Sequence, residues 1–186
     1  LWGQPAASGR WAALPADLHH RRRLMSPSRR LAEDGLLTAI LFALQISLSY
    51  LPNIELVSLF VILYTLVLGK RVIPILLAFS LLEGLLYGFG IWWVSYLYVW
   101  PILSGFAWLL KKYHFPDWGF WFLSCGFGLC FGFLCSIPYL SGGLGAALSW
   151  WIAGIPFDLL HGIGNLAVAF VLFRPFKRIL YYCLNR

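Results

Sequence analysis

Residues 55–71, with the sequence ELVSLFVILYTLVLGKR, carry the pattern that sets the fold class. Glu55 stands at the start of this stretch and Lys70 and Arg71 at its end, and no charged side chain lies between them. An uncharged apolar run that ends in basic residues is typical of a helix that crosses a bilayer and stops at the cytoplasmic surface. The stretch therefore predicts a membrane-spanning helix.

The composition of the whole chain agrees with this reading. Of 186 residues, 61% are hydrophobic, 18% aromatic and only 11% charged, and the mean hydropathy is +0.79. Soluble domains are about 45–50% apolar and about 25% charged, so a water-soluble globule is excluded. No stretch after the N-terminal segment is long and polar enough for an extramembrane catalytic domain, and no GxxxxGK[ST] phosphate loop occurs.

The chain contains six apolar runs separated by charges, prolines or glycines, near residues 35–51, 55–69, 72–90, 92–110, 119–139 and 148–173. A helix needs about 20 such residues to cross a hydrocarbon core of about 30 Å. The predicted fold class is therefore an all-α membrane protein with six transmembrane helices, in a membrane domain of residues 35–175. Residues 1–34 are predicted to be a disordered segment that is partly non-native before Met25, and residues 176–186 a cytoplasmic tail.

The basic residues orient these spans. All 14 lysines and arginines lie in four segments: before the first span, in the second and fourth connections, and after the last span. They are Arg10, Arg21, Arg22, Arg23, Arg29, Arg30, Lys70, Arg71, Lys111, Lys112, Arg174, Lys177, Arg178 and Arg186. In a six-span protein these segments lie on one side of the membrane, and the positive-inside rule makes that side cytoplasmic. The net charge of +7 thus reflects membrane topology, and we expect no nucleic-acid partner.

The cysteines predict packing rather than chemistry. Cys125, Cys130 and Cys135 are spaced by five residues, which places neighbours about 140° apart around a helix, so they share no face. Cys183 lies in the tail. We expect no metal site, disulfide framework or cofactor.

Polar side chains within predicted spans are functional candidates, because an ionisable group at mid-bilayer costs roughly 2.5–3.5 kcal/mol on insertion scales. Asp158, His161 and Asn165 share one helix face, and Gly154 and Pro156 are expected to bend that helix. Two interpretations stay open. The three side chains either make interhelical hydrogen bonds, worth about 0.6 kcal/mol each, or they contact a ligand.

Glu83 is the corresponding candidate in the third predicted span. Gly84 and Gly88 form a G-x-x-x-G pattern that allows close helix approach, so Glu83 is expected to face the bundle interior. It either meets a substrate or pairs with His161. Glu55, by contrast, has an ordinary role as an acid in the first turn of the second span, with Asn53 as its N-cap.

Aromatic residues and a small-residue segment complete the candidate site. Tyr96 and Trp100 lie four residues apart on one face of the fourth span, where they either pack or stack on a flat, cationic ligand. Residues 141–147, SGGLGAA, are predicted to form a flexible outer lid.

The first span contains Ala39 and Ala43 in LLTAILFALQ, an A-x-x-x-A pattern that lets another helix approach closely. With six spans and cytoplasmic termini, this pattern resembles the S component of an energy-coupling-factor (ECF) transporter. The stretches PNIELVSLFVILYTLVLGKR (52–71), LLEGLLYGFGIWWVSYLYVW (81–100) and IPFDLLHGIGN (155–165) also resemble S components of unassigned substrate.

The resemblance implies a multi-pass subunit of a prokaryotic cell membrane. Such a subunit captures a vitamin-like compound in its outer half and docks, through Ala39 and Ala43, on a transmembrane subunit that works with two ATPase subunits. Substrate residues do not transfer within the family. From the residues themselves we expect Glu83, Tyr96, Trp100, Asp158, His161 and Asn165 to bind substrate. Since the outer half contains no lysine or arginine, a neutral or cationic heteroaromatic compound suits it better than a dianion.

Two alternatives belong to other classes. An intramembrane hydrolase or transferase would use Asp158 and His161 with a nucleophile such as Ser95 or Cys135, although no motif identifies that nucleophile. A membrane scaffold protein without a ligand is the third possibility. The resemblance favours a substrate-capture subunit that is not an enzyme.

The topology is directly testable in a variant that lacks the native cysteines. A cysteine at Gly143 should react with an impermeant thiol reagent added outside intact cells, and a cysteine at Lys111 should not. The opposite labelling pattern would overturn both the orientation and the outward-facing site.

Overall fold

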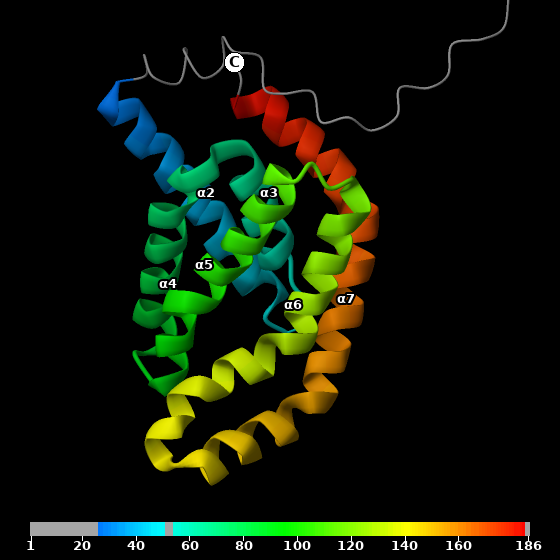
Figure 1. The fold of residues 1–186 in the computed structure, drawn as a ribbon. Coiled ribbons are helices and arrows are strands. Elements are labelled where there is room, and N and C mark those ends of the chain that lie inside the picture. The colour runs from blue at the N-terminus through cyan, green and yellow to red at the C-terminus, as the bar shows by residue number, and fades with distance from the viewer. Residues whose placement is uncertain (1–25, 51–53, 185–186) are drawn as a thin grey trace, which may run out of the picture.

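The computed structural model describes residues 26–50 and 54–184, which are almost entirely helical and contain no strand. In this part of the chain two 3-10 helices, η1 (Gly69–Arg71) and η2 (Ile137–Gly142), connect longer elements. The α-helices are α2 (Pro27–Leu48), α3 (Val57–Leu68), α4 (Val72–Tyr87), α5 (Ile91–Lys112), α6 (Asp117–Ser136) and α7 (Leu144–Leu184). Figure 1 shows them as an up-and-down bundle.

Local chemistry explains several helix ends. The Ser26 hydroxyl accepts a hydrogen bond from the Arg29 backbone N–H at 3.3 Å, and Pro27 takes the first helical position of α2, where no N–H is needed. Near the end of α3, the Lys111 ammonium donates to the Leu66 carbonyl at 2.6 Å. Helix α4 stops at Gly88, whose φ of 87° is a conformation that other residues rarely adopt.

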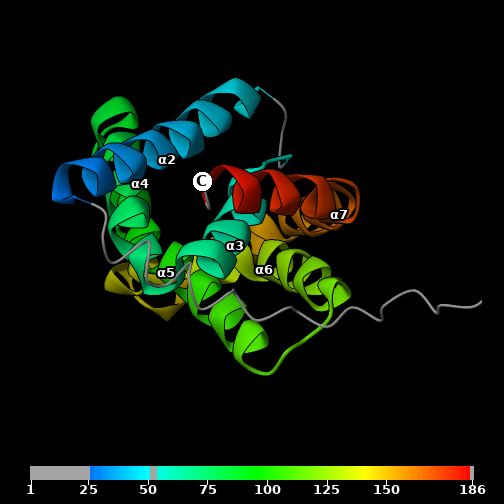
Figure 2. The ribbon, with the colours of Figure 1, turned by 90° about the horizontal axis from the view of Figure 1, so that it is seen from above.

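Helix α3 is the centre of the bundle. Residues 57–67 are all buried, and α3 contacts each of the other α-helices, which surround it in Figure 2. Its few polar groups are satisfied by neighbours. The hydroxyls of Thr65 and Ser104 lie 2.9 Å apart, and the Tyr64 hydroxyl donates to the Leu37 carbonyl of α2 at 3.3 Å.

Glycines let α6 and α7 approach so closely that their backbones touch. A Cβ built on Gly128 of α6 would lie only 2.8 Å from the backbone nitrogen of Gly162 in α7. A Cβ on Gly162 would in turn meet the side chain of Leu129 at 2.6 Å. Real Cβ atoms do not come this close to backbone atoms, so this crossing needs glycine at position 128, whereas a Cβ at position 162 would require the Leu129 side chain to move.

The far ends of these two helices turn aside. Figure 1 shows the end of α6, η2 and the first turns of α7 crossing the lower end of the bundle as a yellow-to-orange hairpin. Pro156 lies within α7, where the missing N–H leaves the helix without one of its hydrogen bonds. The expected bend of this span is therefore present, although the helix continues through it.

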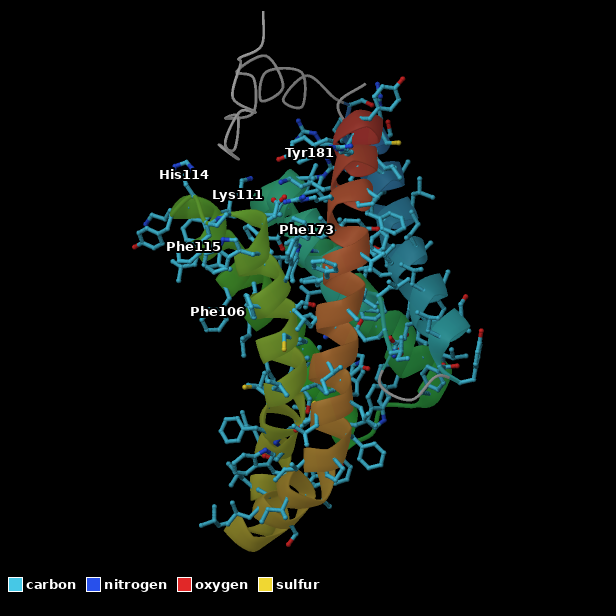
Figure 3. All side chains as sticks on the ribbon, turned by 90° about the vertical axis from the view of Figure 1, so that its right-hand side faces the viewer. Phe106, Lys111, His114, Phe115, Phe173 and Tyr181 are labelled. Carbon is cyan, nitrogen blue, oxygen red and sulfur yellow. The ribbon has the colours of Figure 1, made fainter. Side chains whose placement is uncertain are left out.

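The basic clusters lie at the opposite end. Figure 1 shows the start of α2, η1, the α5–α6 connection and the end of α7 at its top, and Figure 3 shows Lys111, His114 and Tyr181 there. Ion pairs tie this end together. Arg71 contacts Glu33 and Asp34 of α2 at 3.2 and 2.9 Å, while Asp117 contacts Arg174 and Lys177 at 3.1 and 2.9 Å.

Each predicted span corresponds to one helix, but the boundaries differ. Helix α2 begins before the predicted first span because Ser26 and Pro27 initiate it, and α7 extends through the predicted tail to Leu184. Five helical stretches are long and apolar enough to cross a membrane, because α3, η1 and α4 count as one stretch, Val57–Tyr87. Six separate crossings with cytoplasmic termini stay a prediction.

Two smaller expectations look different in the structure. The segment of residues 141–147 is largely helical, since η2 reaches Gly142 and α7 starts at Leu144, so its role as a lid stays a prediction but its flexibility as a loop does not. Gly84 does not admit a neighbouring helix; the space beside it is filled by the rings of Phe89 and Trp93. The predicted N-cap Asn53 and residues 1–25 lie outside the described residues. Because the φ of Gly143 is 96°, the exposed Ser141 is a better position for an outer cysteine reporter.

The α6–α7 crossing makes a stability prediction. Gly128→Ala should lower the melting temperature of the purified protein by several degrees, because overpacking costs about 1–3 kcal/mol and each kcal/mol corresponds to about 2–4 °C at this chain length. Gly126→Ala is the matched control, since a Cβ there meets no atom within 4 Å. Equal melting temperatures for the two variants would contradict the close crossing.

Candidate functional site

Three buried polar residues on one face of α7 form one side of the site. Asp158, His161 and Asn165 are 6%, 6% and 1% exposed, and each reaches a different part of the bundle. The Asp158 Oδ1 atom accepts a hydrogen bond from the Gly132 backbone N–H of α6 at 2.8 Å. The Asn165 amide donates to the Ser124 carbonyl of α6 at 3.3 Å.

His161 pairs with Glu55. Its Nε2 atom lies 3.3 Å from Glu55 Oε1, just before the start of α3. An ionised carboxylate only accepts hydrogen bonds, so Nε2 carries the proton in this contact. The possible partnership of His161 with Glu83 is therefore replaced by one with Glu55.

Glu55 has a second partner, because its Oε2 atom accepts the Ser58 backbone N–H at 2.7 Å. Glu55 is not the first-turn acid that the sequence predicted, because α3 begins at Val57 with Leu56 as its N-cap; the carboxylate accepts this N–H from outside the helix. Burial alone would raise the pKa of Glu55, but the contacts with His161 and Ser58 outweigh burial and hold that pKa below its ordinary value. Glu55 is thus an ionised group that links the start of α3 to α7.

Glu83 approaches from α4. It is 1% exposed and lies in the last turns of the helix, away from the basic end. The Tyr96 hydroxyl of α5 lies within electrostatic range of both Glu83 and Glu55.

Aromatic rings pack beside these polar groups. Tyr96 and Trp100 meet edge to face with centroids 5.4 Å apart, as their shared helix face requires. Trp100 also contacts Phe127 and Phe131 of α6 at 5.7 and 6.0 Å. Phe131 then meets the His161 ring at 5.0 Å, so the rings connect α5 through α6 to the polar face of α7.

Several buried polar atoms of this region have no hydrogen-bond partner. They are Glu83 Oε1, Trp100 Nε1, Asp158 Oδ2 and Asn165 Oδ1. An unpartnered buried polar atom costs about 1–3 kcal/mol, and more when the group is charged. Ser58, Trp121 and Ser124 also keep an unpartnered buried atom. Folded proteins leave few such atoms, so the four named here are candidates for contact with a polar ligand.

The sequence did not identify every residue that shapes the site. The sequence indicated Glu55 only as an acid at a helix start, because no local sequence pattern predicts its contact with His161, which is 106 positions away. Gly132 and Phe131 of α6 were also missed. The G-x-x-x-G spacing of Gly128 and Gly132 was the available signal for a close contact on α6.

The groups that metal or nucleophilic chemistry would use are placed as follows. The described residues contain no group of three or more His, Cys, Asp or Glu side chains that could hold a metal ion. The Ser95 hydroxyl donates to the Cys135 carbonyl at 3.5 Å, while His161 pairs with Glu55. Neither suggested nucleophile is therefore placed as the hydrogen-bond partner of His161.

Comparison of the chain with protein-family models, with curated proteins and with solved structures found no match. The residues of the chain and their geometry therefore carry the functional assignment.

If the Glu83 carboxylate lacks a partner, its replacement by an apolar side chain should stabilise the protein. Glu83→Met should raise the melting temperature of the ligand-free protein by about 2–4 °C, since it removes about 1 kcal/mol or more of uncompensated burial. Thr65→Val is the contrasting control and should lower the melting temperature, because it breaks the contact with Ser104. A fall with Glu83→Met would show that Glu83 holds helices together instead.

Proposed function

We propose that this chain is the substrate-binding membrane subunit of an uptake transporter of the energy-coupling-factor type. It captures a small water-soluble compound in the half of the bundle opposite the basic end. It then docks on a membrane subunit that is driven by two ATPase subunits. The chain itself has no enzymatic role in this proposal.

The observation that carries the proposal is the set of unpartnered atoms on Glu83, Trp100, Asp158 and Asn165. These atoms comprise three acceptors and one donor, next to aromatic rings. Small-molecule sites combine such apolar walls with a few placed polar groups. Burial of these unpartnered atoms lowers the stability of the free protein. A ligand that supplies hydrogen-bond partners would restore that stability.

The charges of the site favour a neutral or cationic ligand. Glu55, Glu83 and Asp158 are acidic, and His161 is already engaged by Glu55. The lysines and arginines of the described helices lie at the other end of the bundle, in the starts and ends of α2, η1, α5 and α7. A dianion would be repelled here, whereas a heteroaromatic cation could pair with a carboxylate and stack on the rings.

The surface of α2 supports the docking role. Ala39 and Ala43 are both exposed, and Gly35 and Ser47 continue the same four-residue spacing on that helix. Leu37, Thr38 and Leu41 form the opposite, buried face. Small exposed side chains let a partner helix pack closely against this surface.

Co-purification tests the proposal. From membranes of its native host, the tagged wild-type chain should retain a membrane subunit and two ATPases. Ala39→Leu or Ala43→Leu should reduce that retention about tenfold, or about 1.4 kcal/mol, because the added bulk separates the helices. Ala153→Leu is the control, since Ala153 is an exposed alanine of α7.

Native mass spectrometry of the same samples tests whether the chain binds a small compound. The isolated chain should carry a small polar compound, and the two α2 variants should keep it because α2 contributes no site residue. If wild type retains neither ATPases nor a bound compound, the transport assignment is wrong. Equal retention of the membrane subunit by all variants would show that α2 is not the docking surface.

A further inference from the structure

The site is closed to water in this structure. Glu83, Trp100, Asp158 and Asn165 are between 1% and 6% exposed. A solute that binds their unpartnered atoms therefore needs an element that moves. Two elements adjoin site residues without belonging to the central bundle: the segment that carries Glu55, and the hairpin formed by residues 133–155, which lies between Gly132 and Asp158 in the chain.

The hairpin is built as a unit. Its two helical arms contact each other through aromatic rings. The ring centroids of Phe133 and Trp151 are 5.2 Å apart, and those of the stacked Tyr139 and Trp150 are 4.1 Å apart. Most of its residues between 137 and 155 are exposed. Such internal pairs favour movement of the whole hairpin over its local unfolding.

Few polar contacts hold the hairpin to the bundle. On α5, the Tyr98 hydroxyl donates to the Leu134 carbonyl at 2.6 Å and the Ser95 hydroxyl to the Cys135 carbonyl at 3.5 Å. Both acceptors are among the last carbonyls of α6, and the Leu134 carbonyl also accepts the backbone N–H of the C-cap residue Ile137. These contacts join the hairpin to α5, but they do not join its two ends, near residues 133 and 155, to each other.

Where the hairpin leaves the bundle, a hydrogen bond joins α6 to α7. Gly132 adjoins the hairpin on α6, and its backbone N–H donates to Asp158, two residues after Pro156 on α7. A Cβ on Gly132 would lie 2.5 Å from Asp158 Oδ2, so the carboxylate can sit there only against glycine. Pro156 weakens the α7 hydrogen-bond ladder at the same level.

We propose that the hairpin of residues 133–155 is the gate of the site and that the Gly132–Asp158 contact is its latch. One carboxylate then has two tasks: Oδ1 holds the latch, and the unpartnered Oδ2 is left for the ligand. Phe131, next to Gly132, contacts both Trp100 and His161 in the closed form that this structure shows. The gating role rests on the proposed function, but the latch itself does not.

Ligand binding and closure are coupled by this arrangement. Opening would carry Phe131 and Gly132 away from Asp158 and disassemble the site, so a ligand that needs all of them binds the closed form better. A ligand shifts a conformational equilibrium only by its difference in affinity for the two forms. Here Asp158 supplies that difference, because it belongs to both the latch and the site.

The latch is tested without any ligand, by electron–electron distance measurements between nitroxide labels at Ser141 on the hairpin and Lys70 at the basic end. Both positions are exposed, and the native cysteines are replaced by alanine. Gly132→Ala and Asp158→Ala should each raise the fraction of a second, open distance about tenfold, which equals about 1.4 kcal/mol. Gly126→Ala is the matched glycine control and should resemble wild type.

Asp158→Asn separates a latch from a general structural role. Its amide oxygen can still accept from the Gly132 N–H, so the distance distribution should stay close to that of wild type. If Gly132→Ala does not fold, Asp158→Ala against Asp158→Asn decides the question. The latch is wrong if Asp158→Ala and Asp158→Asn give the same distribution, or if Gly132→Ala matches Gly126→Ala. Because no ligand is present, a failed transport assignment leaves this result unaffected.

Discussion

The contact of α6 with α7 at Gly128 and Gly162 is the constraint on which the rest of this structure depends. Because the two backbones touch there, the polar face of α7 is pressed against α6. Asp158 then reaches the Gly132 N–H, Asn165 reaches the Ser124 carbonyl, and Phe131 covers the ring of His161. With bulkier residues at this crossing, the helices would separate and every one of these contacts would lengthen.

The bundle treats its buried polar groups in two different ways. Thr65, Ser104, Tyr98 and Ser80 meet hydroxyl or carbonyl partners on neighbouring helices, which is what a low-dielectric interior requires. Glu83, Trp100, Asp158 and Asn165 keep atoms without a partner. Ser58, Trp121 and Ser124 also keep an unpartnered buried atom, but Glu83 and Asp158 are the acidic members of the set inside the bundle. A ligand that completes these atoms would account for their retention.

The two ends of the molecule are chemically distinct. At one end, Arg71 and Asp117 organise ion pairs that tie α2 to η1 and α6 to α7. At the other end, the hairpin of residues 133–155 crosses the bundle and is joined to α5 by two hydrogen bonds and by packing of Leu134 and Cys135 on the core. Ionic ties at one end and a hairpin without ion pairs at the other are the arrangement on which the proposed docking and gating rest.

Hydropathy and the placement of charges along the sequence predicted the helices and their alternating direction. The apolar runs predicted the helices, and the clustering of Lys70, Arg71, Lys111 and Lys112 predicted that alternate connections meet at one end, because both patterns depend on near neighbours in the chain. The shared face of Asp158, His161 and Asn165 followed from helix geometry in the same way.

Long-range contacts needed the folded chain. The pairing of His161 with Glu55 instead of Glu83, and the latch between Gly132 and Asp158, join residues 106 and 26 positions apart. No local pattern encodes which of two acids a histidine meets. That choice depends on the depth and rotation of each helix, which are set when side chains pack around α3 and glycines bring α6 and α7 together.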